Sequence, residues 1–213
     1  MKTRKTVIAI GAMLGLMALG APAEAQTSVE FELSPFAGGT LFLTDLPNQF
    51  HVQRRGQSDV EIEGGRYQDA FTLGANAGIR LNDRFGFEAF FAWLPTTLEA
   101  RSGIANDVDL DGFMYGLTFL YHFNTERVRP FLGAGAGGET FDYSALGWDR
   151  HTEFMTNLVA GANVAITPST AIRLEARDCI TWFDPHISGV SRTVENDLML
   201  TVGLDWRVSL SGG

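Results

Sequence analysis

Residues 198–210 read Leu-Met-Leu-Thr-Val-Gly-Leu-Asp-Trp-Arg-Val-Ser-Leu, so that every second position carries a large apolar side chain. Because successive side chains of a strand point to opposite faces, this stretch predicts one strand with a continuous apolar face. Strands of soluble proteins are typically only about 5–6 residues long. A tilted strand that crosses a bilayer needs about 9–11 residues with their apolar side toward the lipid. The stretch therefore predicts a transmembrane β-strand.

Seven further stretches show the same alternation, and each ends at a turn or a polar connection. They cover residues 29–43, 71–81, 85–93, 108–123, 128–141, 154–166 and 172–177. The connections alternate between long and short, as in bacterial outer-membrane barrels with short periplasmic turns and long external loops. The first long connection, residues 45–68, is polar and is expected to be a loop. The sequence predicts an all-β fold, an eight-stranded antiparallel up-and-down transmembrane β-barrel.

Two places within these strands predict local irregularity. Pro35 has no amide hydrogen to donate to a ladder, which favours a bulge or a local gap. Val108 and Leu110 have the opposite parity to the apolar residues that follow them. A register slip near Asp111 and Gly112 would reconcile the two parities, because glycine often marks a bulge.

Aromatic residues gather near both ends of the predicted strands, as they do at the two interfaces of a membrane. The two sets are Phe85, Phe87, Tyr121, Phe123 and Trp206 near the short turns, and Phe71, Trp93, Phe113, Tyr115 and Phe154 near the long connections. The main alternative is a soluble eight-stranded cup of the lipocalin type, with its apolar face inside. The two aromatic sets and a polar face rich in glycine and charged residues favour the membrane barrel.

The first 25 residues have the features of a cleaved signal peptide. A basic start, an apolar run at residues 7–19 and the small-x-small sequence Ala23-Glu24-Ala25 are its three parts. We expect cleavage after Ala25, export through the general secretory pathway, and a barrel domain over residues 26–213. An uncleaved N-terminal anchor helix is the alternative.

The chain is acidic, with 16 Lys and Arg residues against 25 Asp and Glu residues and a formal net charge of −9. This charge argues against a nucleic-acid partner. The single cysteine, Cys179, excludes an intrachain disulfide and a cysteine metal cluster. We expect no cofactor.

Ten charged residues fall on the polar face of the strands, toward the ends that carry the short turns. They are Glu30, Glu32, Arg80, Glu88, Arg129, Arg173, Glu175, Arg177, Asp205 and Arg207. Equal numbers of acids and arginines in a narrow lumen favour a plug of salt bridges, because an unpaired buried charge is strongly destabilising. Arg173, Glu175 and Arg177 share one strand, and their partners are expected on the first, third and last strands. An ion or proton pathway, or a gate, is the functional alternative.

Three segments carry a resemblance to a known superfamily. They are residues 32–39 (ELSPFAGG), 129–137 (RPFLGAGAG) and 172–177 (IRLEAR). They are similar to segments of the small outer-membrane β-barrels that include the OmpA transmembrane domain, OmpX and OmpW. The resemblance implies the outer membrane of a Gram-negative-type bacterium, with outer-membrane lipid, lipopolysaccharide and the outer-membrane assembly machinery as partners. It implies a fold and no single function.

Two other patterns resemble parts of functional motifs, a calcium-binding loop and a serine hydrolase site, but each lacks a required feature. Residues 107–112, Asp-Val-Asp-Leu-Asp-Gly, imitate the start of a calcium loop, but Thr118 stands where the loop needs a bidentate Glu. We expect a solvated strand entry there, with weak divalent-cation binding as the alternative. The lipid A deacylases share this architecture and use a Ser, a His and a carboxylate. His122 has no Ser two positions on, and His186 with Ser188 falls in a loop, so we expect no enzyme.

These observations favour a structural or surface-interaction role through long extracellular loops, with a lumen closed by paired charges. A small OmpW-like channel for ions or apolar solutes is the first alternative. A lipid A-modifying hydrolase is the second. The pattern of residues does not specify an extracellular ligand.

Overall fold

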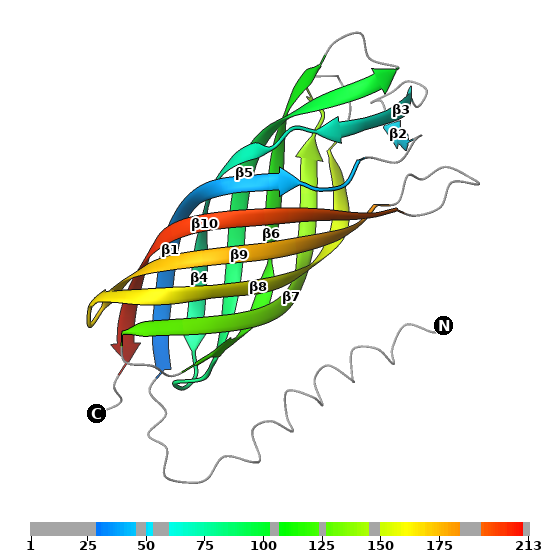
Figure 1. Cartoon of the computed structure of the whole chain (residues 1–213). Helices are drawn as coiled ribbons and strands as arrows, with labels where there is room; N and C mark the ends of the chain where they lie inside the picture. Colours follow the sequence, from blue (N-terminus) through cyan, green and yellow to red (C-terminus); the bar gives the residue numbers. More distant parts are fainter. Residues whose placement is uncertain are drawn as a thin grey trace, which may run out of the picture.

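The computed structural model describes residues 29–45, 50–52, 60–102, 107–123, 127–144, 150–183 and 193–210. Within these ranges, no helix has the length and apolar character needed to cross a membrane. The expected signal peptide and its cleavage site lie outside the described residues. The strands are β1 (Val29–Phe42), β2 (Phe50–Val52), β3 (Val60–Tyr67), β4 (Ala70–Arg80), β5 (Phe85–Ser102), β6 (Val108–His122), β7 (Val128–Asp142), β8 (His151–Thr167), β9 (Thr170–Phe183) and β10 (Thr193–Leu210) (Figure 1).

Eight of these strands close one antiparallel barrel. The sheet order is β2-β3-β5-β4-β1-β10-β9-β8-β7-β6, and an additional pairing of β5 with β6 closes the eight strands from β5 to β6 into a ring. A closed ring leaves no edge strand within the barrel. The first and last strands pair from Val29 with Leu210 to Phe42 with Asp197, which completes the wall (Figure 1). The predicted eight-stranded antiparallel barrel is confirmed.

A short turn at one end of the barrel shows how local sequence starts a hairpin. The side-chain oxygen of Asn82 accepts hydrogen bonds from the backbone amides of Arg84 and Phe85, both at 2.9 Å. Asparagine favours such turns because its side chain can replace a backbone acceptor. The chain therefore reverses between β4 and β5 with few residues.

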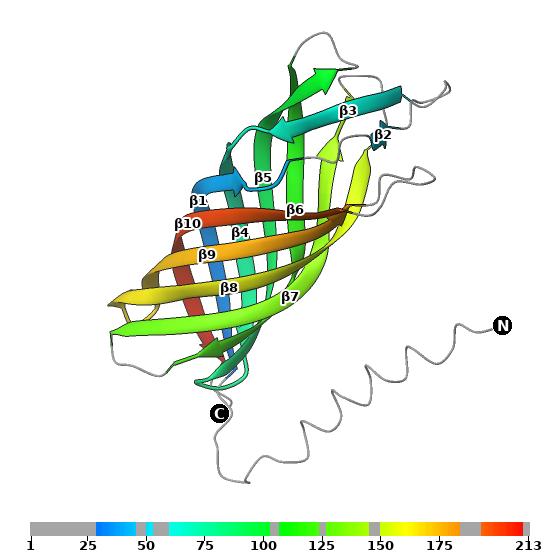
Figure 2. The same cartoon turned by 45° about the vertical axis from the view of Figure 1, so that its right-hand side comes forward.

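The connection between β1 and β4 differs from the expected loop. It contains β2 and β3, which pair with each other, and β3 then pairs with the outer part of β5, from Glu63 opposite Ser102 to Tyr67 opposite Leu98. β5 is correspondingly longer than the predicted strand, which ended at Trp93. Figure 2 shows β3 as an extension of the wall beyond β1 and β4. The loop prediction was wrong because these residues pair with β5 above the end of β4.

Of the two predicted irregularities, one is present. The pairing of β1 with β10 skips Ser34 and Pro35 and resumes at Phe36 in the same register, which is the local gap expected at a proline. The slip at Asp111 and Gly112 is wrong, because β6 pairs with β5 in one unbroken register. Leu110 is instead buried inside the barrel, where the outer part of the lumen is apolar. The structure places a register shift between Ala165 and Thr167, where β8 meets β9.

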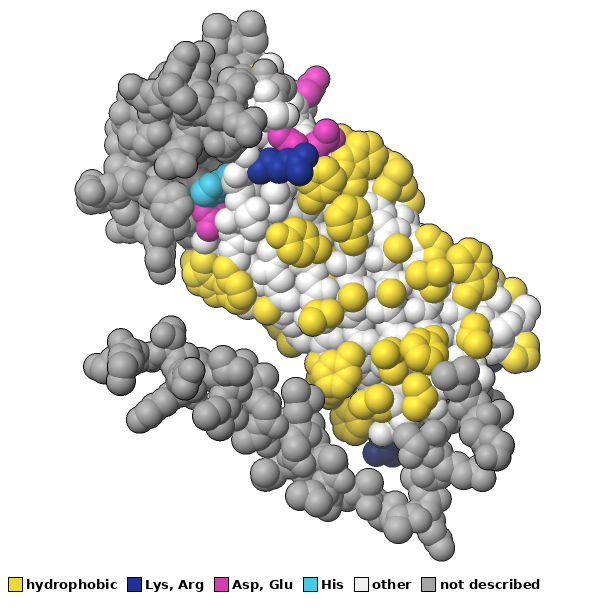
Figure 3. Space-filling model, turned by 180° about the vertical axis from the view of Figure 1, so that it is seen from behind, with side chains coloured by type: hydrophobic (Ala, Val, Ile, Leu, Met, Phe, Trp, Pro, Cys, Tyr) yellow, Lys and Arg dark blue, Asp and Glu magenta, His cyan; other side chains and the backbone are white. Residues whose placement is uncertain are grey.

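The outward face of the strands is apolar, which excludes the soluble cup. Figure 3 shows a wide band of hydrophobic side chains over this face of the barrel, with most of the visible charged side chains beyond it at one rim. Aromatic rings pack beside one another at both ends of the band. Phe85 and Phe119 lie 5.7 Å apart at the end with the short turns, and Phe154 and Trp182 lie 5.7 Å apart at the other end. We refer to the end that bears the long connections as the outer end.

One carboxylate interrupts this apolar band. Asp178 lies between the fully buried, inward-facing Arg177 and Cys179, so alternation turns it outward. Its neighbours across the ladders are Leu158 on β8 and Leu198 on β10. Asp178 is therefore a charged side chain among apolar neighbours on the outward face.

Candidate functional site: the charged lumen

Four charged side chains form the centre of the lumen, and we call them the central quartet: Glu88, Arg173, Glu175 and Arg177. Alternation along β9 turns Arg173, Glu175 and Arg177 inward, and β5 supplies Glu88 from a strand that does not pair with β9. All four side chains are at most 2% exposed. The quartet therefore lies across the lumen and joins two separate parts of the wall.

Each arginine of the central quartet contacts both carboxylates. Arg173 lies 2.6 Å from Glu88 and 2.5 Å from Glu175. Arg177 lies 3.1 Å from Glu88 and 2.8 Å from Glu175. The two positive and two negative charges thus alternate around a closed ring, which is the arrangement in which buried charges are compensated.

Aromatic and polar side chains hold the two arginines in place. The guanidinium of Arg177 lies 4.0 Å from the ring centroid of Phe90, and that of Arg173 lies 4.4 Å from the ring centroid of Phe131. Nη1 of Arg177 also donates to Thr118 Oγ1 and to Asn157 Oδ1, both at 2.9 Å. Cation–π contacts of desolvated arginines add attraction beyond the ion pairs. The quartet is therefore packed on its sides as well as paired.

A second set of charges lies nearer the short turns, and we call it the lower network: Glu30, Glu32, Arg80, Asp205 and Arg207. Arg80 contacts Glu32 and lies 2.9 Å from Glu30. Arg207 lies 2.9 Å from Asp205 and 3.5 Å from Glu32. Ser34 Oγ donates to Asp205 at 2.7 Å. The lower network links β1, β4 and β10, which are neighbours in the wall.

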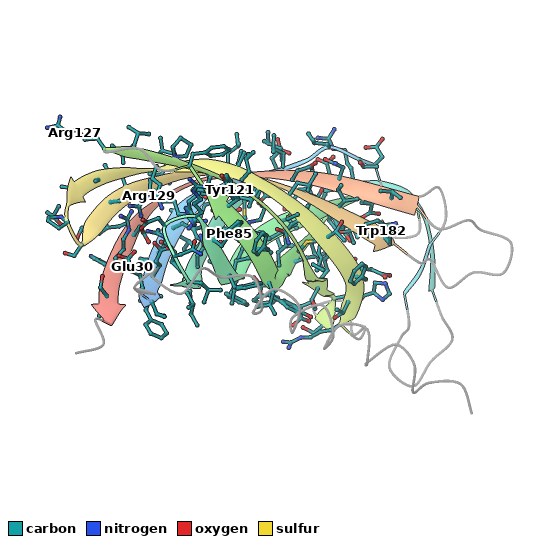
Figure 4. All side chains as sticks on the ribbon, turned by 90° about the horizontal axis from the view of Figure 1, so that it is seen from below. Glu30, Phe85, Tyr121, Arg127, Arg129 and Trp182 are labelled. Atoms are coloured by element: carbon teal, nitrogen blue, oxygen red, sulfur yellow. The ribbon has the colours of Figure 1, made fainter. Side chains whose placement is uncertain are left out.

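The tenth predicted residue, Arg129, lies outside both groups. It is only half-buried, and its Nη1 has no hydrogen-bond partner. Figure 4 places Arg129 and Glu30 toward the same end of the barrel, away from Trp182. His122 is buried near this end, with its ring centroid 5.7 Å from that of Phe131 and with both ring nitrogens unpartnered.

The partners expected for the β9 arginines were mostly wrong. Glu88 on the third predicted strand does contact them, but the acids of the first and last strands contact Arg80 and Arg207 instead. Glu175 itself bridges the two arginines of its own strand. Each arginine pairs with the acids that lie at its own height in the barrel. That height is set by strand tilt, and the alternation of side chains along a strand does not reveal it.

An apolar layer fills the lumen beyond the central quartet toward the outer end. Its fully buried members are Ala92, Leu94, Leu98, Met114, Met155, Cys179 and Met199. Flexible methionines fill irregular gaps well, which suits a lumen of uneven width. The sequence prediction missed this layer because it treated the inward face as polar throughout. The signal was present in the inward parity of Val108 and Leu110.

Four acidic side chains, which we call the outer acidic group, lie at the outer end: Glu139, Glu153, Glu195 and Asp197. Glu139, Glu195 and Asp197 are buried. Oε2 of Glu139 accepts a hydrogen bond of 2.8 Å from Thr181, and Glu153 lies 2.5 Å from His151. Glu153, Glu195 and Asp197 were missed because the predicted strands began after them, whereas Glu139 falls within the predicted strand 128–141 and was not recognised as a lumen charge. Glu195 and Asp197 are an even number of residues from Asp205 along β10, so strand alternation predicts that they also face the lumen.

The aspartates of the calcium-like sequence lie on the outer surface of the rim. Asp109 accepts a hydrogen bond of 2.9 Å from Thr97, and Asp111 accepts one of 2.8 Å from Trp93. A hollow of about 370 Å³ next to them is also lined by Asp142, whose pKa is lowered by hydrogen bonds from Ser144 and by Arg150. In the part of the chain that is described, no three metal-ligating side chains are placed to hold a metal ion. The alternative pair His186 and Ser188 lies outside the described residues.

Comparison with solved structures found several outer-membrane proteins with similarity to this chain. The Neisserial surface protein A structure matches with a TM-score of 0.53 and 16% identity over 84% of this chain and 96% of that chain. Outer membrane protein W of E. coli matches with a TM-score of 0.46 and 12% identity, over 86% of this chain and 100% of that chain. The outer membrane enzyme PagL matches with a TM-score of 0.38 and 15% identity, over 82% of this chain and 98% of that chain.

No curated protein matched the chain at the level of sequence. The family comparison is more extensive, because residues 11–207 match the outer membrane protein β-barrel domain. A match over this length includes β1 and β4 to β9 in full and β10 as far as Arg207, and it places the chain in the outer membrane. The chain belongs to the outer membrane protein β-barrel domain family.

Proposed function

We propose that this protein is a non-enzymatic outer-membrane barrel with a closed lumen, whose role is structural or exerted through its external loops. The observation that carries the proposal is the central quartet, which joins β5 to β9 across the lumen at 2.6 Å between Arg173 and Glu88. An ion that entered the lumen would have to break these pairs.

The apolar layer supports the same proposal. Leu94, Met114 and Met155 are fully buried directly beyond the quartet. An ion loses its hydration there without gaining polar partners, which is strongly unfavourable. The lumen therefore combines two barriers to ions, the paired charges and the apolar layer. We infer that contact with other molecules is left to the long connections at the outer end.

Conductance of the refolded protein in planar bilayers tests this proposal. The wild-type protein should show no stable conductance steps above the bare membrane. The substitution Glu88→Ala should introduce them, because it removes the only quartet member that comes from β5. Glu99→Ala, at an exposed acid of the same strand, serves as the control and should behave as wild type. Stable steps in the wild-type protein would overturn the closed lumen.

A small channel for apolar solutes is the second candidate, and the apolar layer is the observation that favours it. Movement of Met114, Met155 and Met199 could admit an apolar molecule from the outer end, because methionine side chains repack easily. Uptake of an apolar dye by intact cells, with and without the protein, tests this. Faster uptake that Met155→Arg abolishes would favour the channel, and equal uptake would favour the closed barrel.

The non-enzymatic part of the proposal rests on the described histidines. His122 is buried beside Phe131, and His151 is bound to Glu153. Both ring nitrogens of His122 are unpartnered, whereas a hydrolase of the serine type requires a base hydrogen-bonded to its serine. Mass spectrometry of lipid A from cells with and without the protein tests this part. A change in acylation would contradict it.

We also infer export through the general secretory pathway, with removal of residues 1–25, followed by insertion by the assembly machinery into lipid and lipopolysaccharide. The basic start, apolar run and small-x-small site of the sequence support the first step. The apolar outward face supports the last (Figure 3). The mass of the mature protein tests the cleavage, because it should begin at Gln26.

A further inference from the structure

Three buried members of the outer acidic group differ from the other lumen charges, because none of them has an arginine partner among the described residues. Glu139, Glu195 and Asp197 are 2%, 5% and 3% exposed. They come from β7 and β10, and Glu153 of β8 lies opposite Glu139 in the ladder. Three strands therefore bring carboxylates to one part of the outer end.

Four of the described arginines pair with other acids, and Arg129 lies toward the opposite end of the barrel (Figure 4). Arg173 and Arg177 belong to the central quartet, Arg150 is bound to Asp142, and Arg66 lies near Glu99. Among the described residues, none of the ion pairs reaches Glu139, Glu195 or Asp197. Buried carboxylates without a compensating charge are strongly unfavourable unless something neutralises them. Glu139, Glu195 and Asp197 therefore need a partner that the described part of the chain does not supply.

Two oxygen atoms show where that partner would bind. Oε1 of Glu139 and Oε1 of Glu195 are buried and have no hydrogen-bond partner. Both residues line a small cavity of about 10 Å³, together with Tyr67, Phe141, Tyr143, His151, Glu153 and Thr181. A space of about this size holds a single water-sized group. Unsatisfied buried acceptors facing such a space indicate a missing donor.

The walls of the cavity favour a positive group. Phe141 stacks on Tyr67 with ring centroids 4.2 Å apart, and the hydroxyl groups of Tyr67 and Tyr143 lie 2.5 Å apart. Aromatic rings combined with carboxylates are the surroundings in which proteins bind ammonium groups. A metal ion is a poorer fit, because the described residues include no three ligating side chains placed to hold one.

We propose that this cavity binds a primary ammonium group presented from the external side. The nitrogen donates to Oε1 of Glu139 and to Oε1 of Glu195, and the rings of Tyr67 and Tyr143 face its remaining surface. A quaternary ammonium has no N–H to donate and is too large for the space. The proposal does not depend on the role of the barrel, since it names a ligand class for a site apart from the central quartet.

The test uses the refolded full-length barrel in detergent micelles, with methylammonium chloride as the probe. Sodium chloride and tetramethylammonium chloride at equal ionic strength are the control salts. Methylammonium should raise the unfolding temperature in a saturable way and shift the backbone amide resonance of Thr181. The two control salts should do neither at the same concentrations.

Isosteric variants separate binding from folding. Glu139→Gln and Glu195→Gln keep the shape of the cavity and remove an uncompensated charge, so both should fold. Each should weaken methylammonium binding by about tenfold or more, because a charge-assisted hydrogen bond is lost. Glu99→Gln, at an exposed acid outside the cavity, should change it by less than about twofold.

The proposal is overturned by any of three results. One is an equal response to sodium and methylammonium. Another is binding that Glu139→Gln and Glu195→Gln leave unchanged. The third is no response to methylammonium at all, which would mean that protons or a basic side chain of the chain itself neutralise the carboxylates.

Discussion

Glu88 on β5 and Arg177 on β9 meet inside the barrel at 3.1 Å, although three strands separate them in the sheet. The contact joins two parts of the wall that have no backbone hydrogen bonds to each other. Arg173 reaches the same carboxylate at 2.6 Å. The quartet therefore cross-links the barrel through its lumen.

Removing Glu175 should destabilise the barrel more than any change at an exposed acid. Glu175→Ala leaves Arg173 and Arg177 with one carboxylate between them, and an uncompensated buried charge costs about 3–5 kcal/mol. The free energy of unfolding from a urea titration in lipid vesicles measures this. Glu99→Ala is the matched control. Similar losses for the two variants would show that the lumen charges are hydrated.

Gly161 should not tolerate a side chain. A Cβ at this position would overlap the ring of Phe131, which stacks on Arg173, and the carbonyl of Leu174. Overpacking of this kind costs about 1–3 kcal/mol, so Gly161→Ala should lower the free energy of unfolding by that amount. Gly39→Ala is the control, because its Cβ would lie 3.6 Å from the nearest atom. Equal stability of the two variants would argue against tight packing beside the quartet.

The sequence predicted the strands and the direction of their side chains better than it predicted contacts. Alternation alone turned Arg173, Glu175 and Arg177 inward, because strand geometry has a fixed period of two. It could not choose between Glu30 and Glu88 as partners, since height in the barrel depends on tilt and stagger between distant strands. Leu110 was assigned outward because the lumen was assumed to be polar throughout. Glu195 was missed because its strand was taken to begin at Leu198.

A charged side chain on the lipid face should lower the free energy of unfolding more, the closer it lies to the middle of the membrane. Leu200 is outward and exposed near the middle of β10. Leu200→Arg should destabilise the barrel by about 2–4 kcal/mol in vesicle refolding, whereas Thr97→Arg, at the outer rim, should cost about 0–1 kcal/mol. If Leu200→Arg cost no more than the rim variant, the band in Figure 3 would not be in contact with lipid.

The alternation of connections predicts which segments face outside. Tags inserted at the long connections should be cut by external protease in intact cells, and tags at the short turns should be protected. The first set of positions is Gly56, Ser102, Ser144 and Ser188, and the second is Asn82, Thr125 and Ser169. Immunoblotting after protease treatment gives the result. The opposite pattern would reverse the orientation of the barrel and place the outer acidic group in the periplasm.

A double-mutant cycle of Glu175 and Arg177 tests the closed, cross-linked lumen most directly. Their side chains lie 2.8 Å apart, and removal of both leaves Arg173 paired with Glu88. Glu175→Ala combined with Arg177→Ala should therefore lose less stability than the two single losses together, with a coupling energy of about 1–3 kcal/mol. Strictly additive losses would show that the two charges are independently hydrated, and an open lumen would then describe the barrel better.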